Sequence, residues 1–289
     1  MGLTLPSFVR GVDRSAIREW CRRVDEGPFT SISVGERIAY PSHELVATLA
    51  FAAAATERVR IVSTVAVLPI HDPVRFAKQM ATIDVLSGGR LTVGVGVGGR
   101  DQDYDALGVP FERRFARVDE QVEVMQRVWR GETIVEGLPP VGPEPVQPGG
   151  PPLLTAAMGP KSLERSARWA VGLAGFDLGP DPVGVDATFR RAEAAWAAAG
   201  RTEDPWLSTS SWFALGEGAA ERLSAYAFEY LSNFGERPAR AMAGLCRLSD
   251  AAAMRETLAA LSETGCHEVV LVPTTFAIAE LDRLLAVLG

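Results

Sequence analysis

The segment from Val93 to Gly98 alternates valine with glycine, and the charged run from Arg100 to Asp103 follows it. Successive residues of a strand face opposite sides, so one face of this segment is packed with valine while the other is bare backbone. Glycine weakens a strand interior, and it often marks a place where a ligand or another backbone approaches closely. We therefore expect Gly96, Val97 and Gly98 to contact a flat or bulky ligand.

A second group of residues has the chemistry of an anion site. Met158 and Gly159 follow a predicted strand, and Pro160, Lys161 and Ser162 open the next helix. A helix N-terminus presents free N–H groups and a partial positive charge, to which the lysine ammonium and the serine hydroxyl would add. The alternative is that Gly159 or Ser162 only caps the helix.

Acid–base chemistry has few candidates, because the chain contains three histidines. His71 follows a predicted strand and is the best candidate for a general base, given an unperturbed imidazole pKa of about 6.5. Glu36 follows another strand and is the second catalytic candidate. Its neighbour Arg37 cannot serve as a general acid or base near neutral pH. The alternative for Glu36 and Arg37 is an ion pair at the rim of the fold.

Arg100 is the candidate cation of the ligand site, because a guanidinium group suits a phosphate or a carboxylate. A salt bridge to Asp101 or Asp103 is the alternative. No His-x-His motif occurs and no carboxylate cluster accompanies a histidine, so a metal-dependent hydrolase is disfavoured and we expect no metal site. The G-x-S-x-G motif of serine hydrolases is also absent.

The glycines of the same region also fit the G-x-G-x-x-G fingerprint of dinucleotide-binding sheets, at Gly94, Gly96 and Gly99. That fingerprint requires a strand before the glycines, a helix that opens directly on them and an acid at the end of the next strand. Here the glycines lie inside the predicted strand and a polar segment follows. The classical dinucleotide-binding interpretation is therefore disfavoured.

These residues must be positioned by strands and helices that alternate along the whole chain. Strands are predicted at residues 2–6, 30–34, 59–68, 91–97, 152–156, 171–176, 206–215 and 268–272. Helices are predicted at 14–25, 42–56 (with Ser42 as N-cap), 73–86, 113–130, 161–170, 185–199, 217–234, 250–263 and 278–288. Such alternation favours a parallel sheet, and eight units in 289 residues favour a closed barrel. We predict an α/β fold, a single (β/α)₈ TIM barrel over residues 1–289, with its site at the carboxyl ends of the strands.

One segment interrupts the alternation. Residues 137–152 contain seven prolines and four glycines, which exclude regular structure over most of the segment. We interpret it as an ordered loop over the barrel that helps to line the ligand pocket.

Composition narrows the classes of partner and location. The net charge is −7 and no basic run is present, so nucleic acid is not an expected partner. Three scattered cysteines without a C-x-x-C spacing indicate free thiols in a reducing compartment. No signal peptide and no apolar run long enough to span a bilayer are evident, so we expect a cytoplasmic protein without membrane contact.

Three motifs occur in order along the chain: LSGGR at Leu86 to Arg90, VGVGVG at Val93 to Gly98, and ALGVPFERR at Ala106 to Arg114. In this order they resemble the bacterial luciferase-like family of flavin- and deazaflavin-dependent oxidoreductases. The resemblance covers most of the chain and is weakest between Val183 and Leu248. It implies hydride transfer between the deazaflavin coenzyme F-420 and a small-molecule organic substrate, and a homodimer. FMN-dependent monooxygenation is the alternative within the family, and a non-catalytic flavin- or ligand-binding barrel is the alternative outside it.

The resemblance also assigns roles to individual residues. Ser63, Thr64 and Val65 match the stretch that the family lays against the cofactor ring, often with a non-proline cis peptide. Arg100 matches a cofactor-contacting position, and the helix after Gly159 would hold the cofactor phosphate. The chain departs from the family at two points. Arg37 stands where many deazaflavin-using relatives carry a histidine, and Ala157-Met158-Gly159 replaces their glycine pair.

Overall fold

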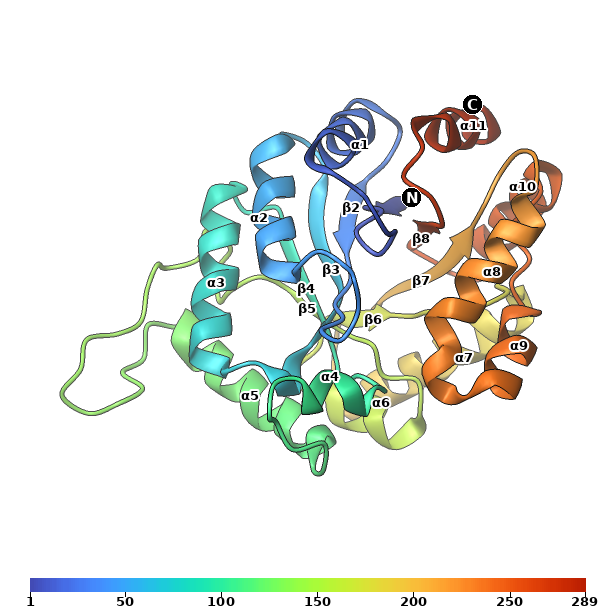
Figure 1. The fold of residues 1–289 in the computed structure, drawn as a ribbon. Coiled ribbons are helices and arrows are strands. Elements are labelled where there is room, and N and C mark those ends of the chain that lie inside the picture. Colours follow the sequence, from blue (N-terminus) through green and yellow to red (C-terminus); the bar gives the residue numbers. More distant parts are fainter.

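The computed structural model describes every residue from Met1 to Gly289 and contains a closed barrel of eight parallel strands (Figure 1). The strands follow one another around the barrel in chain order: β1 (Gly2–Thr4), β2 (Ser31–Val34), β3 (Arg60–Val67), β4 (Leu91–Gly96), β5 (Leu153–Thr155), β6 (Gly172–Ala174), β7 (Trp206–Phe213) and β8 (Glu268–Pro273). The predicted (β/α)₈ barrel is therefore confirmed, and each of the eight predicted strands is present within a few residues of its expected bounds.

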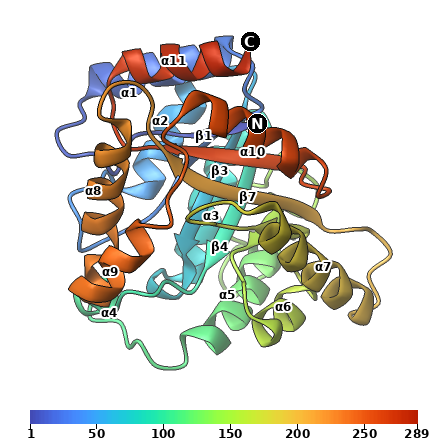
Figure 2. The ribbon, with the colours of Figure 1, turned by 90° about the vertical axis from the view of Figure 1, so that its right-hand side faces the viewer.

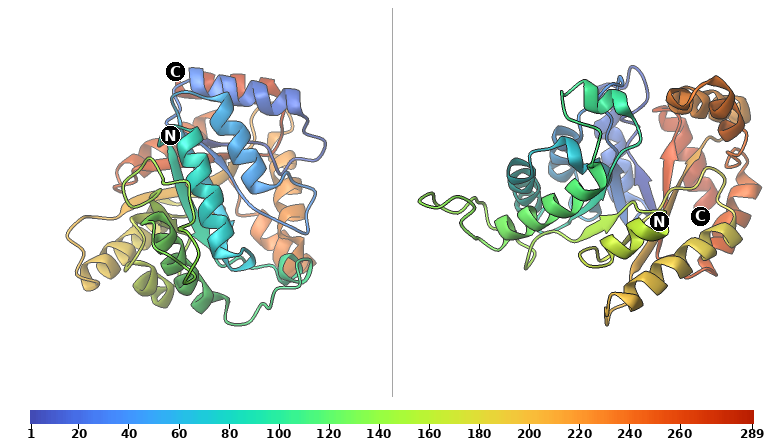
Figure 3. Two further views of the ribbon diagram at one scale, coloured as in Figure 1. Left: turned by 90° about the vertical axis from the view of Figure 1, so that its left-hand side faces the viewer. Right: turned by 90° about the horizontal axis from the view of Figure 1, so that it is seen from below.

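Helices cover the outside of the barrel, as Figures 2 and 3 show from three further directions. They are α1 (Arg14–Glu26), α2 (Leu45–Ala55), α3 (Pro73–Leu86), α4 (Asp101–Asp105), α5 (Arg114–Trp129), α6 (Pro160–Ser166), α7 (Pro182–Ala198), α8 (Ala219–Leu231), α9 (Glu236–Ala243), α10 (Ala251–Ser262) and α11 (Ile278–Leu288), with short 3-10 turns η1 (Leu68–Ile70) and η2 (Ser232–Phe234). None of these helices is long and apolar enough to cross a bilayer. The three cysteines are free.

Three local predictions need correction. The N-cap of α2 is Glu44, whose carboxylate accepts the Ala47 N–H; Ser42 instead donates its hydroxyl hydrogen bond to the Arg37 carbonyl. The polar segment after β4 contains the short helix α4, with two acidic residues in its first turn, where the helix dipole favours negative charge. The region after α8 contains an additional helix, α9.

The proline-rich segment lies on the opposite side of the barrel from where we expected it. It joins the end of α5 to the start of β5, so it lies at the amino ends of the strands. Figure 1 shows the chain between these two elements projecting away from the body on the left. Its contacts are with that side: Lys78 donates to the Gly142 carbonyl, and the Gln147 side chain donates to Asp84 and to the Leu91 carbonyl. The loop therefore does not cover the site.

The glycines of β4 are explained first by the neighbouring strand. A Cβ on Gly94 would lie 2.3 Å from the Ser63 carbonyl oxygen, and one on Gly96 would lie 3.0 Å from a methyl group of Val65. The register between β3 and β4 shifts between Ser63 and Ala66, and the Thr64–Val65 peptide is cis. The bare face of β4 thus admits β3 at close range, and only its carboxyl end faces open space.

Candidate active site

Two cavities open at the carboxyl ends of the strands. The first, which we call the mouth cavity, has a volume of about 270 Å³ and is lined by residues of, or just after, all eight strands. The second, the α5–α6 cavity, has a volume of about 320 Å³ and lies between the ends of β4 and β5 and the two helices that name it. Ala156, directly after β5, lines both. The two cavities therefore adjoin.

The predicted site residues divide between these cavities. The mouth cavity is lined by Glu36, Thr64, Val65, Gly98 and Arg100. The α5–α6 cavity is lined by Gly96, Val97, Met158, Gly159 and Ser162. Four predicted residues, Ser63, His71, Pro160 and Lys161, line neither. Ser63 is fully buried and donates its hydroxyl hydrogen bond to the Gly94 carbonyl, while Pro160 and Lys161 are exposed.

Glu36 and His71, predicted separately as catalytic candidates, contact each other. The His71 Nε2 atom lies 3.0 Å from both carboxylate oxygens of Glu36, and the Val67 N–H donates to one of them at 2.7 Å. Gln121 donates to the His71 carbonyl, and the His71 ring packs against Phe76. Glu36 thus joins the end of β2 to the loop after β3. Most of its hydrogen-bonding capacity is directed away from the mouth cavity.

Arg37 follows Glu36 but has no carboxylate partner. Its guanidinium carbon lies 3.3 Å from the ring centroid of Tyr230 and 4.9 Å from that of Tyr40, and Nη2 donates to the Tyr230 carbonyl. The Nη1 atom is buried and has no hydrogen-bond partner. Burial lowers the pKa of Arg37, and the nearby Arg100 lowers it further. The expected alternative of an ion pair between Glu36 and Arg37 is not found.

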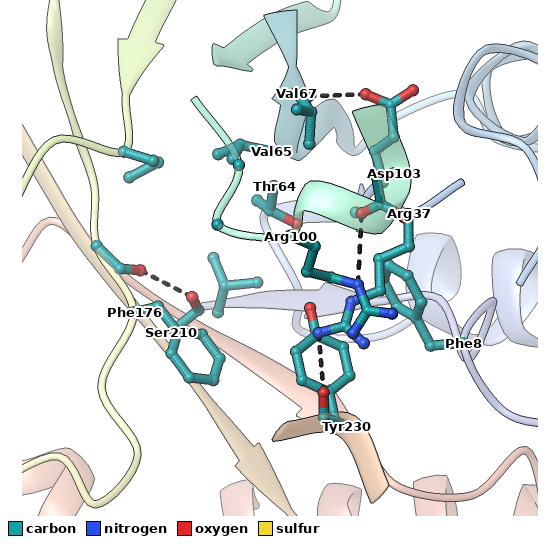
Figure 4. Close-up of a pocket in the computed structure, with 18 of the residues that line it drawn as sticks. Phe8, Arg37, Thr64, Val65, Val67, Arg100, Asp103, Phe176, Ser210 and Tyr230 are labelled. Atoms are coloured by element: carbon teal, nitrogen blue, oxygen red, sulfur yellow. Dashed lines mark hydrogen bonds and ion pairs between the residues drawn. The ribbon is translucent and has the colours of Figure 1, made fainter. Parts of the chain in front are cut away.

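Arg100 forms the salt bridge that we considered as its alternative role. Its Nε atom lies 3.5 Å from the carboxylate of Asp103, and Nη1 donates to the side chain of Asn233 in η2. Asp103 in turn accepts the backbone N–H groups of Ile38 and Ala39. Figure 4 shows Arg37 and Arg100 side by side above Tyr230. Arg100 therefore joins α4 to η2 at the cavity wall, and its own charge is balanced.

In the α5–α6 cavity the charged side chains are already paired. Arg165 forms an ion pair with Asp119, with Nε 2.7 Å from Oδ2, and Trp169 donates to the same carboxylate. Gly159 is the N-cap of α6, and an added Cβ there would meet no atom within 4 Å. Gly159 therefore caps α6, which was the alternative to an anion site, and it also leaves open space beside the start of the helix.

Sequence reasoning missed the aromatic and polar wall of the mouth cavity. Tyr230 and Phe234 come from α8 and η2, where the resemblance is weakest, and no sequence signal marks them. Phe8 follows β1, so the rule that barrel sites lie after the strands could have found it. The Ser208 to Ser210 segment lies in the strand with alternating polar residues, which was the available signal.

A closed eight-stranded barrel with adjoining cavities at the carboxyl ends of its strands defines the class of barrel proteins that bind small molecules there. Within that class, this chain belongs to the luciferase-like monooxygenase family, whose profile matches residues 4–281. The family consists of oxidoreductases.

The proteins that this chain resembles differ in the cofactor that they use. An uncharacterized protein of Mycobacterium tuberculosis is 36% identical over 168 residues, 55% of this chain and 58% of its own length. The oxygenase component of a flavin-dependent trigonelline monooxygenase from Acinetobacter baylyi is 28% identical over 50% of this chain and 44% of its own. The match thus spans about half the length of these curated relatives. The solved structure of an F-420-dependent secondary alcohol dehydrogenase, in complex with an F-420–acetone adduct, has a similar fold, with a TM-score of 0.76 and 19% identity, covering 99% of this chain and 97% of that one.

Proposed function

We propose that this protein is an oxidoreductase that uses the deazaflavin coenzyme F-420 for hydride transfer to or from a small organic substrate. The observation that carries the proposal is the pair of adjoining cavities that meet at Ala156. One has a partly apolar floor, and the other reaches the start of a helix. A flat ring with a phosphate-bearing tail requires that combination.

The residues present fit such a coenzyme. Thr64 and Val65 form part of the mouth cavity, against which a flat ring would lie. Gly98 has a positive φ of 64°, and a Cβ there would lie 2.7 Å from a methyl group of Val67, so glycine is needed where the backbone turns beside the cavity. Gly159 and Ser162 line the other cavity, where the tail phosphate would approach the start of α6.

The coenzyme, when bound, supplies the two-electron redox chemistry, and the protein binds, orients and shields it. Glu36 and His71 have positioning roles in this proposal, because the carboxylate joins β2 to the β3 end that forms the cavity wall. Phe8 and Tyr230 line the mouth cavity, where they would help to exclude water from a substrate placed on the ring.

FMN is the alternative coenzyme, and the similarity to a flavin-dependent monooxygenase supports it. Both coenzymes carry a ring and a phosphate, so the cavities accommodate the two chemistries in the same way. A non-catalytic ligand-binding barrel is the second alternative. The observation that supports it is that both carboxylates of the mouth cavity, Glu36 and Asp103, are already engaged in hydrogen bonds, so neither is free to act as an acid or base.

A titration of the purified protein with each coenzyme tests the proposal. We expect saturable quenching of F-420 fluorescence and weaker or no binding of FMN. Tight binding of FMN without binding of F-420 would favour the monooxygenase alternative. Failure of the protein to bind either coenzyme would contradict an enzyme of this type. Light scattering on the same sample tests the expected homodimer.

A further inference from the structure

The mouth cavity contains a buried cation without a counter-ion. Arg37 is 7% exposed, and none of the ion pairs in the structure includes it. One of its terminal nitrogens donates to the Tyr230 carbonyl, while the other, Nη1, has no partner. A buried charge without a partner is costly, and its presence beside a cavity points to a ligand that completes it.

The neighbouring acids are engaged elsewhere. Glu36 binds the Val67 N–H and the His71 ring. Asp103 binds two backbone N–H groups and faces Arg100 at 3.5 Å. The Nε atom of Arg100 also lacks a hydrogen-bond partner. Two guanidinium groups therefore line this cavity, and both carboxylates beside them, Glu36 and Asp103, are already engaged.

Aromatic side chains also line this cavity. Phe8, Phe176, Tyr230 and Phe234 line the same cavity as Arg37. Figure 4 shows the Arg37 guanidinium over the Tyr230 ring. A guanidinium group binds a planar carboxylate through two parallel hydrogen bonds from its edge, and the partnerless Nη1 of Arg37 lies on that edge.

We infer that the substrate held in the mouth cavity is a flat organic acid whose carboxylate pairs with Arg37. This inference rests on the proposed function and names its substrate class. The carboxylate satisfies Nη1, and the flat body of the acid packs among the aromatic side chains. Since arginine keeps its proton, Arg37 binds and orients the acid and transfers no proton.

Binding of benzoate and of its neutral counterpart benzamide to the full-length protein tests the inference by calorimetry, with and without saturating F-420. We expect wild-type protein to bind benzoate and to discriminate against benzamide by roughly tenfold or more, the usual range for a hydrogen bond to a charged group. Arg37→Met should abolish that discrimination, and Arg37→Lys should restore part of it. Arg10→Met, at an exposed arginine paired with Glu229, is the matched control and should behave as wild type.

The outcomes separate this inference from the proposed function. Coenzyme titration of Arg37→Met should match that of the wild type, which also shows that the variant is folded. Equal affinity for benzoate and benzamide, unchanged discrimination in Arg37→Met, or no benzoate binding by the wild type would overturn the inference. Displacement of benzoate by the coenzyme would also overturn it, because Arg37 would then serve the coenzyme's own acidic groups. Failure of F-420 to bind, with benzoate discrimination intact, would count against the proposed function alone.

Discussion

The two cavities differ in how their arginines are neutralised. In the α5–α6 cavity Arg165 is paired with Asp119, and Trp169 holds the same carboxylate. In the mouth cavity Arg37 lies over the Tyr230 ring, donates to one carbonyl and has a second arginine, Arg100, nearby, but it has no carboxylate partner. A paired arginine contributes structure and little net charge, whereas an unpaired one attracts an anion. We therefore expect the phosphate end of a coenzyme to depend on open space and backbone at Gly159, and the mouth to depend on side-chain charge.

The largest expected effect comes from a negative charge beside α6. Gly159→Asp should weaken coenzyme binding by on the order of 100-fold, because a carboxylate would stand next to the phosphate at the start of α6. Fluorescence titration measures the change. Gly159→Asn is the matched control, since its side chain has the same size without the charge and enters the same open space. If the two variants bound the coenzyme with equal affinity, the coenzyme phosphate would not lie at this position.

A smaller effect is expected at the wall of the mouth cavity. Glu36→Ala leaves the Val67 N–H and the His71 ring without their acceptor, so the free energy of unfolding should fall by about 1–3 kcal/mol. Chemical denaturation provides the measurement. Glu36→Gln retains an acceptor and should lose less, and Glu123→Ala, at an exposed position of α5, should lose almost nothing. If Glu36→Ala were as stable as Glu123→Ala, Glu36 would not hold the wall together.

The smallest effect tests the contrast directly. Asp119→Asn removes the negative partner of Arg165 and should raise coenzyme affinity by roughly twofold to fivefold, because a partly exposed pair is worth up to about 1 kcal/mol. The gain should shrink at high salt, where such charges are screened. Asp186→Asn, which breaks a surface pair with Arg190 on α7, is the control. A loss of affinity would mean that the Arg165–Asp119 pair shapes the site instead of neutralising it.

Sequence reasoning identified the barrel because each strand and its following helix carry their own local signal. Helix α3, for example, was predicted with its observed bounds, since Pro73 opens it and glycine follows its end. Helix α4 was missed because its five residues, four of them polar, are too few to show an apolar periodicity. The proline-rich loop was placed on the wrong side because composition excludes regular structure but does not say which end of a strand a loop joins.

The site was predictable only where it follows a strand. Thr64, Gly98 and Gly159, which line the two cavities, could be predicted because barrel sites lie at strand ends. The contact between Glu36 and His71 was not foreseen, because the two residues lie 35 positions apart and come from different units of the fold. Tyr230 supplies the ring beneath Arg37 from a helix nearly two hundred residues away, and no local pattern announces such a contact. Arg37 itself stood out only as a departure from the family.

The excursion between α5 and β5 has a practical consequence. Leu138 to Pro140 in this segment are exposed, and its anchoring contacts are made by Gly142 and Gln147. A fluorophore or a short peptide tag grafted at Leu138 would lie on the side of the amino ends of the strands, whereas both cavities lie at the carboxyl ends. It would report tumbling and association of the protein while leaving ligand access untouched.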